Sequence, residues 1–416
     1  MNQPTTSFSR DRFTWLAYLM LAYFAFYQSS IGPIMPFLRD ELNLTYTVGG
    51  YHFSAFALGA FLAGLSGERF AKRFGRRKVF WGGAVGMTAG ALWLVLADQV
   101  SQTIAAALLM GFLGTLLLVI IQASLSDHHG NSRAIALTES NVGASMAAGL
   151  APLLIGAATR LGFGWRAAIL AGVLALIALG LRYRQQPIPE APITVVENEG
   201  RPRQLPRLYW AYWLVMTLGV AIEWSLVFWG ADFLNSVVGL SRTNAVTLMS
   251  VFFLAMVSGR FAGSRLTRRM PAANLLLLAL AVALLGFLLY WLAVIPAANV
   301  IGLFVAGLGV ANLFPLTLSV ATSVAAEQAN RASARMSMGG GLAVLIVPLV
   351  LGWTADRIGL KDAFAIVVGL FAVAGAVAVL ANFIARSEEA MTVASSSTAG
   401  NQLNEPNRGN GPESTV

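Results

Sequence analysis

The stretch that decides the fold is LYWAYWLVMTLGVAIEWSLVFWGADFL, residues 208–234. At about 1.5 Å per residue, one helix of this length crosses a hydrocarbon core of ~30 Å. Glu223 lies near its middle with apolar neighbours on both sides. A carboxyl group at that depth costs roughly 2.5–3.5 kcal/mol, which chains tolerate where the group faces a bundle interior or a watery cavity. The stretch therefore predicts a helical membrane scaffold around a central polar cavity that contains Glu223.

The composition extends this prediction to the whole chain of 416 residues. It is 57% hydrophobic and only 11% charged, whereas a soluble protein carries about 25% charged residues. Apolar segments of about twenty residues recur throughout, so we expect an all-α polytopic protein with the lipid bilayer as its surroundings. The net charge of +9 comes from basic residues in short loops, where they control topology, so nucleic acid is not an expected partner.

Several chemical classes are excluded or disfavoured by the sequence. The chain has no cysteine, which excludes disulfides and thiol chemistry. It has no GxxxxGK loop, so ATP-driven transport by this chain alone is unsupported. His128 and His129 are adjacent and do not share a helix face, which argues against a metal site. With no catalytic constellation in one region, we expect no enzyme and no cofactor, and a proton gradient as the energy source.

Twelve membrane spans are predicted, in two bundles of six. The first bundle occupies 13–183 and the second 208–385, with a Pro-rich linker at 184–207. A polar segment at 1–12 precedes them, and a Ser-, Asn- and Gly-rich tail at 386–416 is expected to be disordered. The predicted spans are 13–38, 49–70, 79–98, 102–126, 134–158, 165–183, 208–235, 243–264, 273–293, 297–324, 336–355 and 362–385.

Orientation follows from the basic residues. With the N-terminus inside, most of the 28 Lys and Arg residues lie on the cytoplasmic side. An even number of spans then places both termini in the cytoplasm, and the first span acts as an uncleaved anchor. We therefore expect a multi-pass protein of the plasma membrane, of the bacterial inner-membrane type, that functions as a monomer.

The two bundles repeat each other. MPFLRDELNLT (35–45) resembles ADFLNSVVGLS (231–241), and Pro152 and Gly156 match Pro348 and Gly352 at the same offset. Two related six-span bundles, with a pseudo-two-fold along the membrane normal, place the substrate site at their interface near the bilayer midplane.

The loop after the second span, GERFAKRFGRRK (67–78), resembles the cytoplasmic signature of the major facilitator superfamily. The matching positions are Arg73, Gly75, Arg77 and Lys78. Lys72 stands where the family usually has Asp, and Glu68 stands where it has the first Gly. The resemblance covers essentially the whole chain and implies two six-helix bundles that transport by alternating access.

The resemblance also implies a cytoplasmic gate, because the family's signature loop is thought to hold the two halves together in the outward-facing state. Glu139, close to the cytoplasm in the fifth span, is expected to pair with Arg133, the signature-loop arginines or Arg335. The residues assigned to this gate are Glu68, Arg69, Lys72, Arg73, Gly75, Arg77, Lys78, Glu139 and Arg335.

A narrower resemblance concerns the fucose-permease-like branch of that superfamily. The seventh span with Glu223 and the tenth with GLGVANLFPLTLS (307–319) are similar to it. That branch includes proton-coupled sugar symporters. At the depths of its coupling acids in the first and fourth spans, this chain has Tyr27–Gln28 and Gln122 instead.

The predicted substrate and proton site is centred on Glu223. Removal from water favours the protonated form of a carboxyl group, so Glu223 is assigned to proton exchange or to a polar substrate group. The alternative is a neutral Glu that is hydrogen-bonded to a neighbouring helix. The remaining candidates are the amides Gln28, Gln122, Asn141 and Asn312 and the aromatics Tyr27 and Trp224. Amides alternatively bridge helices, and aromatics alternatively pack or form the interfacial belt.

Together these features predict a proton-coupled secondary active transporter for a small organic solute, either sugar-like or another polar or amphipathic molecule. The alternative is a proton-antiport exporter of drugs or metabolites with the same fold. A Gly- and Pro-containing fifth span loosely resembles an exporter marker, but its weak copy around Pro348 favours a symmetric hinge.

Overall fold

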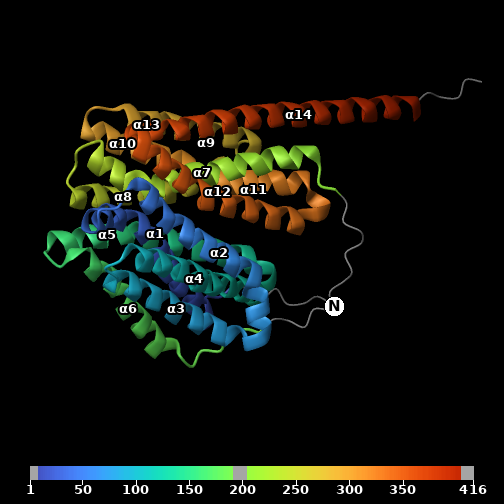
Figure 1. Ribbon diagram of the computed structural model, residues 1–416. Coiled ribbons are helices and arrows are strands. Elements are labelled where there is room, and N and C mark those ends of the chain that lie inside the picture. The colour runs from blue at the N-terminus through green and yellow to red at the C-terminus, as the bar shows by residue number, and fades with distance from the viewer. Residues whose placement is uncertain (1–7, 191–203, 404–416) are drawn as a thin grey trace, which may run out of the picture.

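The computed structural model describes residues 8–190 and 204–403, and the regular structure of these residues is helical (Figure 1). The helices are α1 (Arg12–Leu42), α2 (Tyr46–Phe74), α3 (Arg76–Leu96), α4 (Val100–His129), α5 (Arg133–Arg160), α6 (Gly164–Tyr183), α7 (Arg207–Ser236), α8 (Arg242–Leu266), α9 (Ala272–Leu292), α10 (Pro296–Val310), α11 (Leu313–Val324), α12 (Ala329–Ile358), α13 (Leu360–Ala363) and α14 (Ala365–Leu403), with short 3-10 turns η1 (Gly130–Ser132) and η2 (Ala326–Gln328).

Within the described residues, ten helical segments are long and apolar enough to cross a membrane. One of them, Val100–Arg160, contains both α4 and α5, and the 31-residue α1 is not among the ten. Two other spans are interrupted, one between α10 and α11 and one between α13 and α14. Counting α1 and separating α4 from α5 gives the expected twelve spans, so the all-α polytopic fold is confirmed.

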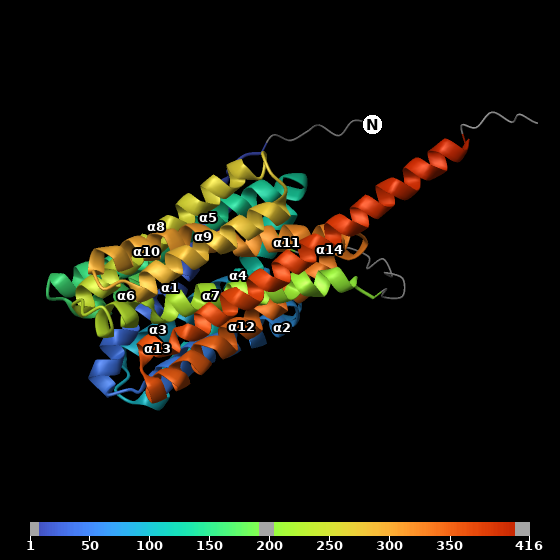
Figure 2. The ribbon, with the colours of Figure 1, turned by 90° about the horizontal axis from the view of Figure 1, so that it is seen from above.

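The helices form two halves, α1–α6 and α7–α14, that lie side by side (Figures 1 and 2). Between the halves, α2 packs on α12, α5 on α8 and α1 on α7. Small residues permit this approach. A Cβ added at Gly32 on α1 would overlap the carbonyl oxygen of Val227 on α7, and one at Gly156 on α5 would overlap Thr247 on α8. The two halves therefore meet backbone to backbone along α1 and α7.

The bundle has two distinct ends. We call the end at which α1 begins, and at which α2 connects to α3 and α4 to α5, the basic end. The end at which α1 connects to α2 and α7 to α8 is the far end. At the basic end, Asp11 caps α1 by accepting from the Thr14 N–H, and Gly75 with φ +80° forms the turn between α2 and α3. A side chain at Gly75 would be strained in this left-handed region.

The structure differs from expectation at the C-terminus. We expected no regular structure after Arg386, but α14 continues as a helix to Leu403 and projects beyond the bundle (Figure 1). Residues 404–416 lie outside the described residues, as do 1–7 and 191–203 of the predicted N-terminal segment and linker. The described parts of the predicted linker, 184–190 and 204–206, are not helical.

Candidate transport site between the two halves

A buried ion pair joins the two halves at the far end. Arg39 Nη1 on α1 lies 2.8 Å from Asp232 Oδ1 on α7. The Asp232 residue is only 2% exposed. The guanidinium also lies over the Tyr46 ring, 3.5 Å from its centroid. Asp232 Oδ2 is buried and has no hydrogen-bond partner among the described residues. This contact holds α1 against α7 as long as the far end is closed.

Further polar contacts cross the same end. The Asp356 carboxylate of α12 accepts the backbone N–H groups of Tyr46 and Thr47, each at 2.7 Å. Arg242 on α8 pairs with Asp40 on α1 at 2.7 Å, in an exposed position. Below them the Phe53 and Phe228 rings stack across the halves with centroids 4.1 Å apart. The far end is thus closed by charge, hydrogen bonds and aromatic packing together.

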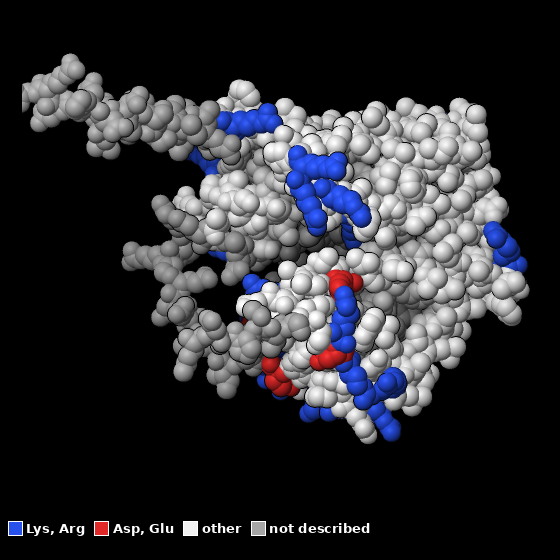
Figure 3. All heavy atoms as spheres, turned by 180° about the vertical axis from the view of Figure 1, so that it is seen from behind, with Lys and Arg blue, Asp and Glu red and all other residues white. Residues whose placement is uncertain are grey.

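The basic end is hollow between the halves (Figure 3). A cavity of about 1020 Å³ lies there, lined by the first part of α5 from one half and by α8 and α11 from the other. Its walls combine apolar side chains with hydroxyls and amides. Arg260 is the only charged residue among those that line it. The cavity is therefore a space with a positive charge in its wall and no carboxylate.

Arg260 is a residue that the sequence analysis did not single out. It lies within α8, and its Nη1 donates a hydrogen bond to Ser145 Oγ on α5 in the opposite half. Its positive charge is near enough to Glu223 to attract an ionised carboxylate there. Arg260 could have been selected from the sequence, because an arginine inside an apolar span is costly to insert into a membrane, as the carboxyl group of Glu223 is.

Glu223 lies within α7 but, contrary to expectation, is not among the residues that line this cavity. Gly219, one turn before it, faces Leu313 of α11, and Val227, one turn after it, meets Gly32 of α1. The Glu223 side chain is half-buried and makes no hydrogen bond within the described residues. The hydrogen bond that the alternative interpretation expected is not seen there, and a role for Glu223 in transport stays a prediction.

Gln28 lies opposite Glu223. Because α1 and α7 both run from the basic end, the residues one turn before the Gly32–Val227 contact stand at the same level. These residues are Gln28 on α1 and Glu223 on α7. The Gln28 side chain is half-buried and has no hydrogen-bond partner among the described residues. The structure thus places two polar side chains at about the same level of the bundle, on helices from the two halves.

Asn141 and Asn312 both line the cavity. Asn141 Nδ2 donates to Leu137 O on its own helix at 2.7 Å. Asn312 lies in the break between α10 and α11, and its Nδ2 donates to Gly259 O on α8 at 2.9 Å. Asn312 therefore bridges two helices, and Asn141 is the freer of the two amides.

Three other candidates, like Glu223 and Gln28, are not among the residues that line the cavity. The Tyr27 side chain is fully buried, and its hydroxyl donates to Ile169 O on α6 at 3.2 Å. Trp224 packs on Phe228 with ring centroids 4.8 Å apart. Gln122 on α4 is exposed and does not line the cavity. The structure does not bring these three side chains to Arg260.

The signature-loop residues make their contacts inside the first half. Glu68 pairs with Lys72 at 2.5 Å, one turn apart on α2. Arg77 donates to Arg184 O, Arg73 lies over the adjacent Phe74 ring, and Arg69 and Lys78 are exposed. The buried arginine of this loop is one we did not select, Arg76, which pairs with Asp127 of α4 at 2.7 Å.

Glu139 has a different partner from those expected. Its carboxylate pairs with Arg10 at 2.5 Å and accepts from the Tyr18 hydroxyl at 3.0 Å. The expected partners, Arg133, the signature-loop arginines and Arg335, are not used for a structural reason. Residues 8–18 lie beside the start of α5, so that Arg10 and Tyr18 contact the Glu139 carboxylate instead. Arg335 instead lies over the Trp210 ring in the second half. Within the part of the chain that the structure describes, the ion pairs of Arg10, Lys72 and Arg76 lie inside the first half.

A helical bundle of two halves, closed at one end and hollow between the halves at the other, has the architecture of a membrane carrier. The chain belongs to the Major Facilitator Superfamily, whose model matches residues 15–348. It is a multi-pass secondary transporter and not an enzyme.

Three similar proteins illustrate this membership. An uncharacterised MFS-type transporter of Yersinia pestis is 26% identical over 393 residues, covering 88% of this chain and 94% of the relative. A protein of Cupriavidus necator named as the probable sulfoacetate transporter SauU is 24% identical over 425 residues, covering 89% and 94%. A crystal structure of a bacterial homologue of the human lysosomal transporter Spinster, inward-facing and unoccupied, has a TM-score of 0.73 at 16% identity and covers 92% of this chain and 98% of that chain.

Proposed function

We propose that this transporter carries small organic anions by alternating access, with Arg260 as the anion-binding group and Glu223 as the proton-exchanging group. The observation that carries the proposal is the charge of the cavity, in which Arg260 stands without a carboxylate among the lining residues. A guanidinium binds an oxyanion through two parallel N–H groups, and in a partly dehydrated cavity that attraction is strong.

The relative named for sulfoacetate supports this substrate class. A small molecule with sulfonate and carboxylate groups matches a cavity that offers one guanidinium together with the amides of Asn141 and Asn312. A neutral sugar, expected from the resemblance to the fucose-permease-like branch, would leave the charge of Arg260 without a partner. We therefore favour the organic anion over the sugar.

Glu223 supplies a physical route to proton coupling. When Glu223 is ionised, its carboxylate attracts Arg260, and when it is protonated, Arg260 is free for a substrate anion. Gln28 at the same level provides an amide that can hydrogen-bond either form. Proton and anion therefore favour the same state of the site, as a symporter requires.

We further propose that the basic end is cytoplasmic, since loops rich in Lys and Arg stay on that side. The structure is then an inward-facing state. The two halves rock about the Gly32–Val227 contact, so that the far-end ion pair Arg39–Asp232 opens when the basic end closes.

The substrate class is tested with proteoliposomes. Uptake of labelled sulfoacetate by the wild type is compared with uptake by Arg260→Gln. We expect the variant to lose at least about tenfold in apparent affinity, because a charge-assisted hydrogen bond contributes about 1.5–3 kcal/mol. The matched control is Arg265→Gln, five residues further on α8. Arg265 does not line the cavity, although its guanidinium lies 3.8 Å from the centroid of the Phe261 ring, which does. Equal affinity in the wild type and Arg260→Gln would overturn the assignment of Arg260.

Coupling and direction are tested in the same vesicles. An inward proton gradient should accumulate the anion if the protein is a symporter and deplete it if the protein is the exporter of our alternative reading. Glu223→Gln should still bind the anion but should no longer respond to the gradient. Unchanged gradient-driven accumulation in Glu223→Gln would remove the proposed role of this carboxyl group.

A further inference from the structure

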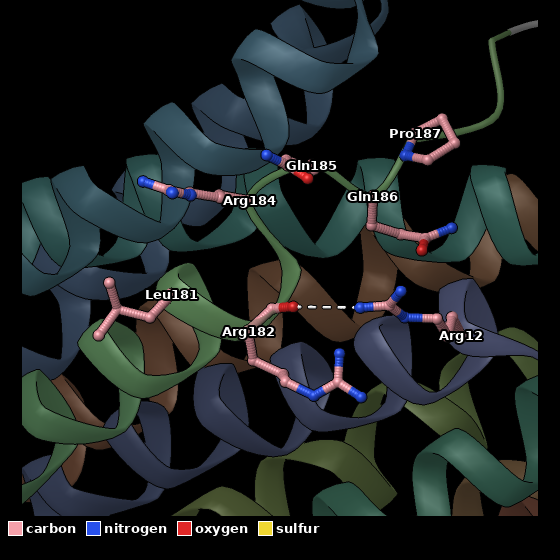
Figure 4. A pocket seen from close by; sticks show the side chains of 7 residues that line it. All are labelled: Arg12, Leu181, Arg182, Arg184, Gln185, Gln186 and Pro187. Carbon is pink, nitrogen blue, oxygen red and sulfur yellow. Dashed lines mark hydrogen bonds between the residues drawn. The ribbon is translucent and has the colours of Figure 1, made fainter.

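A second pocket, separate from the transport cavity, lies at the basic end of the first half (Figure 4). It has a volume of about 390 Å³ and is formed where α1 begins and α6 ends, with residues 184–187 closing one side. Three of the side chains that line it are arginines, Arg12, Arg182 and Arg184. In Figure 4, Arg12 and Arg182 extend their guanidinium groups toward the same space.

These three arginines have no ion-pair partner within the described residues. Arg12 Nη2 donates to the backbone oxygen of Arg182 at 3.4 Å, and Arg77 donates to the backbone oxygen of Arg184, so the pocket walls are fixed. The carboxylate next to Arg12 in the chain, that of Asp11, is occupied by Thr14 and His128. The guanidinium groups of Arg12 and Arg182 share one space, with Arg184 in the pocket wall pointing away from them (Figure 4), and such a group of cations attracts an anion that the described residues do not supply.

The position of the pocket indicates which anion this is. Leu174, Ile177 and Leu181 follow one face of α6 and are 69%, 53% and 71% exposed. Such an apolar stripe at helical spacing on a peripheral membrane helix faces lipid tails. Arg182 and Arg184 come directly after Leu181, at the depth where lipid headgroups begin.

We propose that this pocket binds the phosphate headgroup of an anionic phospholipid, whose acyl chains lie along Leu174, Ile177 and Leu181. Arginine forks match phosphate oxygens in pairs, and several basic groups near the bilayer surface add to one another's attraction. The bound headgroup ties the start of α1 to the end of α6. This site is independent of the proposed substrate and of the proposed orientation.

The test uses the full-length purified protein in detergent, titrated with phosphatidylglycerol or phosphatidylcholine and followed by native mass spectrometry. We expect one phosphatidylglycerol to bind in clear preference to phosphatidylcholine. The variant Arg12→Gln/Arg182→Gln/Arg184→Gln should weaken that binding, by about fivefold for each arginine removed. The triple Lys variant of the same positions should keep part of the affinity, because charge remains while the paired geometry is lost.

The matched control is Arg265→Gln/Arg268→Gln/Arg269→Gln, which removes the same charge from the basic end of the second half. It should leave the preferred phosphatidylglycerol site intact. If the pocket triple fails to fold, Arg182→Gln alone gives the same comparison on a smaller scale. An equal loss in both triple variants, equal binding of both lipids, or displacement of the lipid by millimolar inorganic phosphate would each overturn the proposal.

Discussion

The far end and the basic end of this bundle are built from the same helices, yet they hold the two halves in opposite ways. At the far end, Arg39–Asp232 and the Asp356 contacts with Tyr46 and Thr47 cross between the halves. At the basic end, the pairs Arg10–Glu139 and Arg76–Asp127 stay within the first half. Contacts within a half survive a rocking motion, whereas contacts across the halves must break. We therefore expect the far-end contacts to set the balance between states and these two basic-end ion pairs to set the stability of the first half, while the Arg260–Ser145 hydrogen bond in the basic-end cavity does cross between the halves.

The largest effect is expected from Asp232→Asn. The substitution leaves the Arg39 charge buried opposite a neutral amide, and breaking a buried pair in this way costs about 3–5 kcal/mol. Only the state with a closed far end loses this stability, so the population shifts toward the state in which the far end is open. Because the chain has no native cysteine, spin labels at Leu161→Cys and Val294→Cys, which are 71% and 94% exposed, report the distance between the halves. In the variant, we expect the distribution of distances between the two labels to shift to longer values.

The control for that experiment is the double variant Asp232→Asn/Arg39→Leu, which removes both charges. It should move the labels back toward the wild-type distance, because no buried charge is then left unpaired. If Asp232→Asn gives the wild-type distribution, this pair does not hold the far end closed.

The next effect is expected from Gly32→Ala. The added methyl group would overlap the Val227 carbonyl oxygen, and overpacking of this kind costs about 1–3 kcal/mol. The α1–α7 contact should loosen, and the same label pair should move apart, though less than in Asp232→Asn. Gly64→Ala on α2 is the control, because a Cβ there meets nothing within 4 Å. Identical distances in the two alanine variants would contradict the role of this contact.

A smaller effect of a different kind is expected from Asp11→Ala at the basic end. Loss of this helix cap costs about 1 kcal/mol, so the melting temperature should fall while the label distance stays the same. Partial burial of the Asp11 carboxyl acts to raise its pKa, but the hydrogen bonds from Thr14 and the attraction of His128 outweigh it and hold the pKa below its usual value.

The pH dependence of this cap follows from that direction. A lowered pKa means that Asp11 stabilises the fold above the pKa of the unfolded chain, about 3.9. The stabilisation is lost as the pH falls through the lowered value in the folded protein. The gap in melting temperature between the wild type and Asp11→Ala should therefore be constant near neutral pH and shrink below about pH 3.9. A gap that widens on acidification would contradict this account.

The smallest effect is expected from Asp40→Asn. This variant breaks the exposed pair with Arg242, which crosses the same end as Arg39–Asp232. Exposed pairs contribute about 0–1 kcal/mol, so neither the melting temperature nor the label distance should change measurably. A shift as large as that of Asp232→Asn would show that burial is not what separates the two pairs.

Single residues show how much of the candidate site could be predicted from the sequence. Glu223 was predictable, because a carboxyl group in an apolar span needs a reason to be there whatever the packing. Tyr27 and Gln28 were predicted together, but neighbouring helix positions differ by about 100° in direction. Gln28 is consequently half-buried, while Tyr27 is fully buried against α6. Only the packing of α1 could separate them.

The Arg39–Asp232 ion pair at the far end could not be predicted from the sequence, for a related reason. Each copy of the repeat contains a Phe–Leu pair, which Arg39 follows in the first copy and Asp232 precedes in the second. The opposite charges of these two residues could have suggested an ion pair. Even so, the repeat relates each residue to its copy and does not say which residues touch. That depends on how the two halves are set against each other.

The sequence by itself determined the membrane-spanning helices, their grouping into two related halves and the presence of a costly acid in the seventh span, because hydropathy, charge and repetition are properties of the chain alone. Only the tertiary structure decided which end is closed, which arginine faces Glu223 and which polar residues share a cavity. Those depend on helix rotation and on contacts between residues far apart in sequence, and no local pattern fixes either.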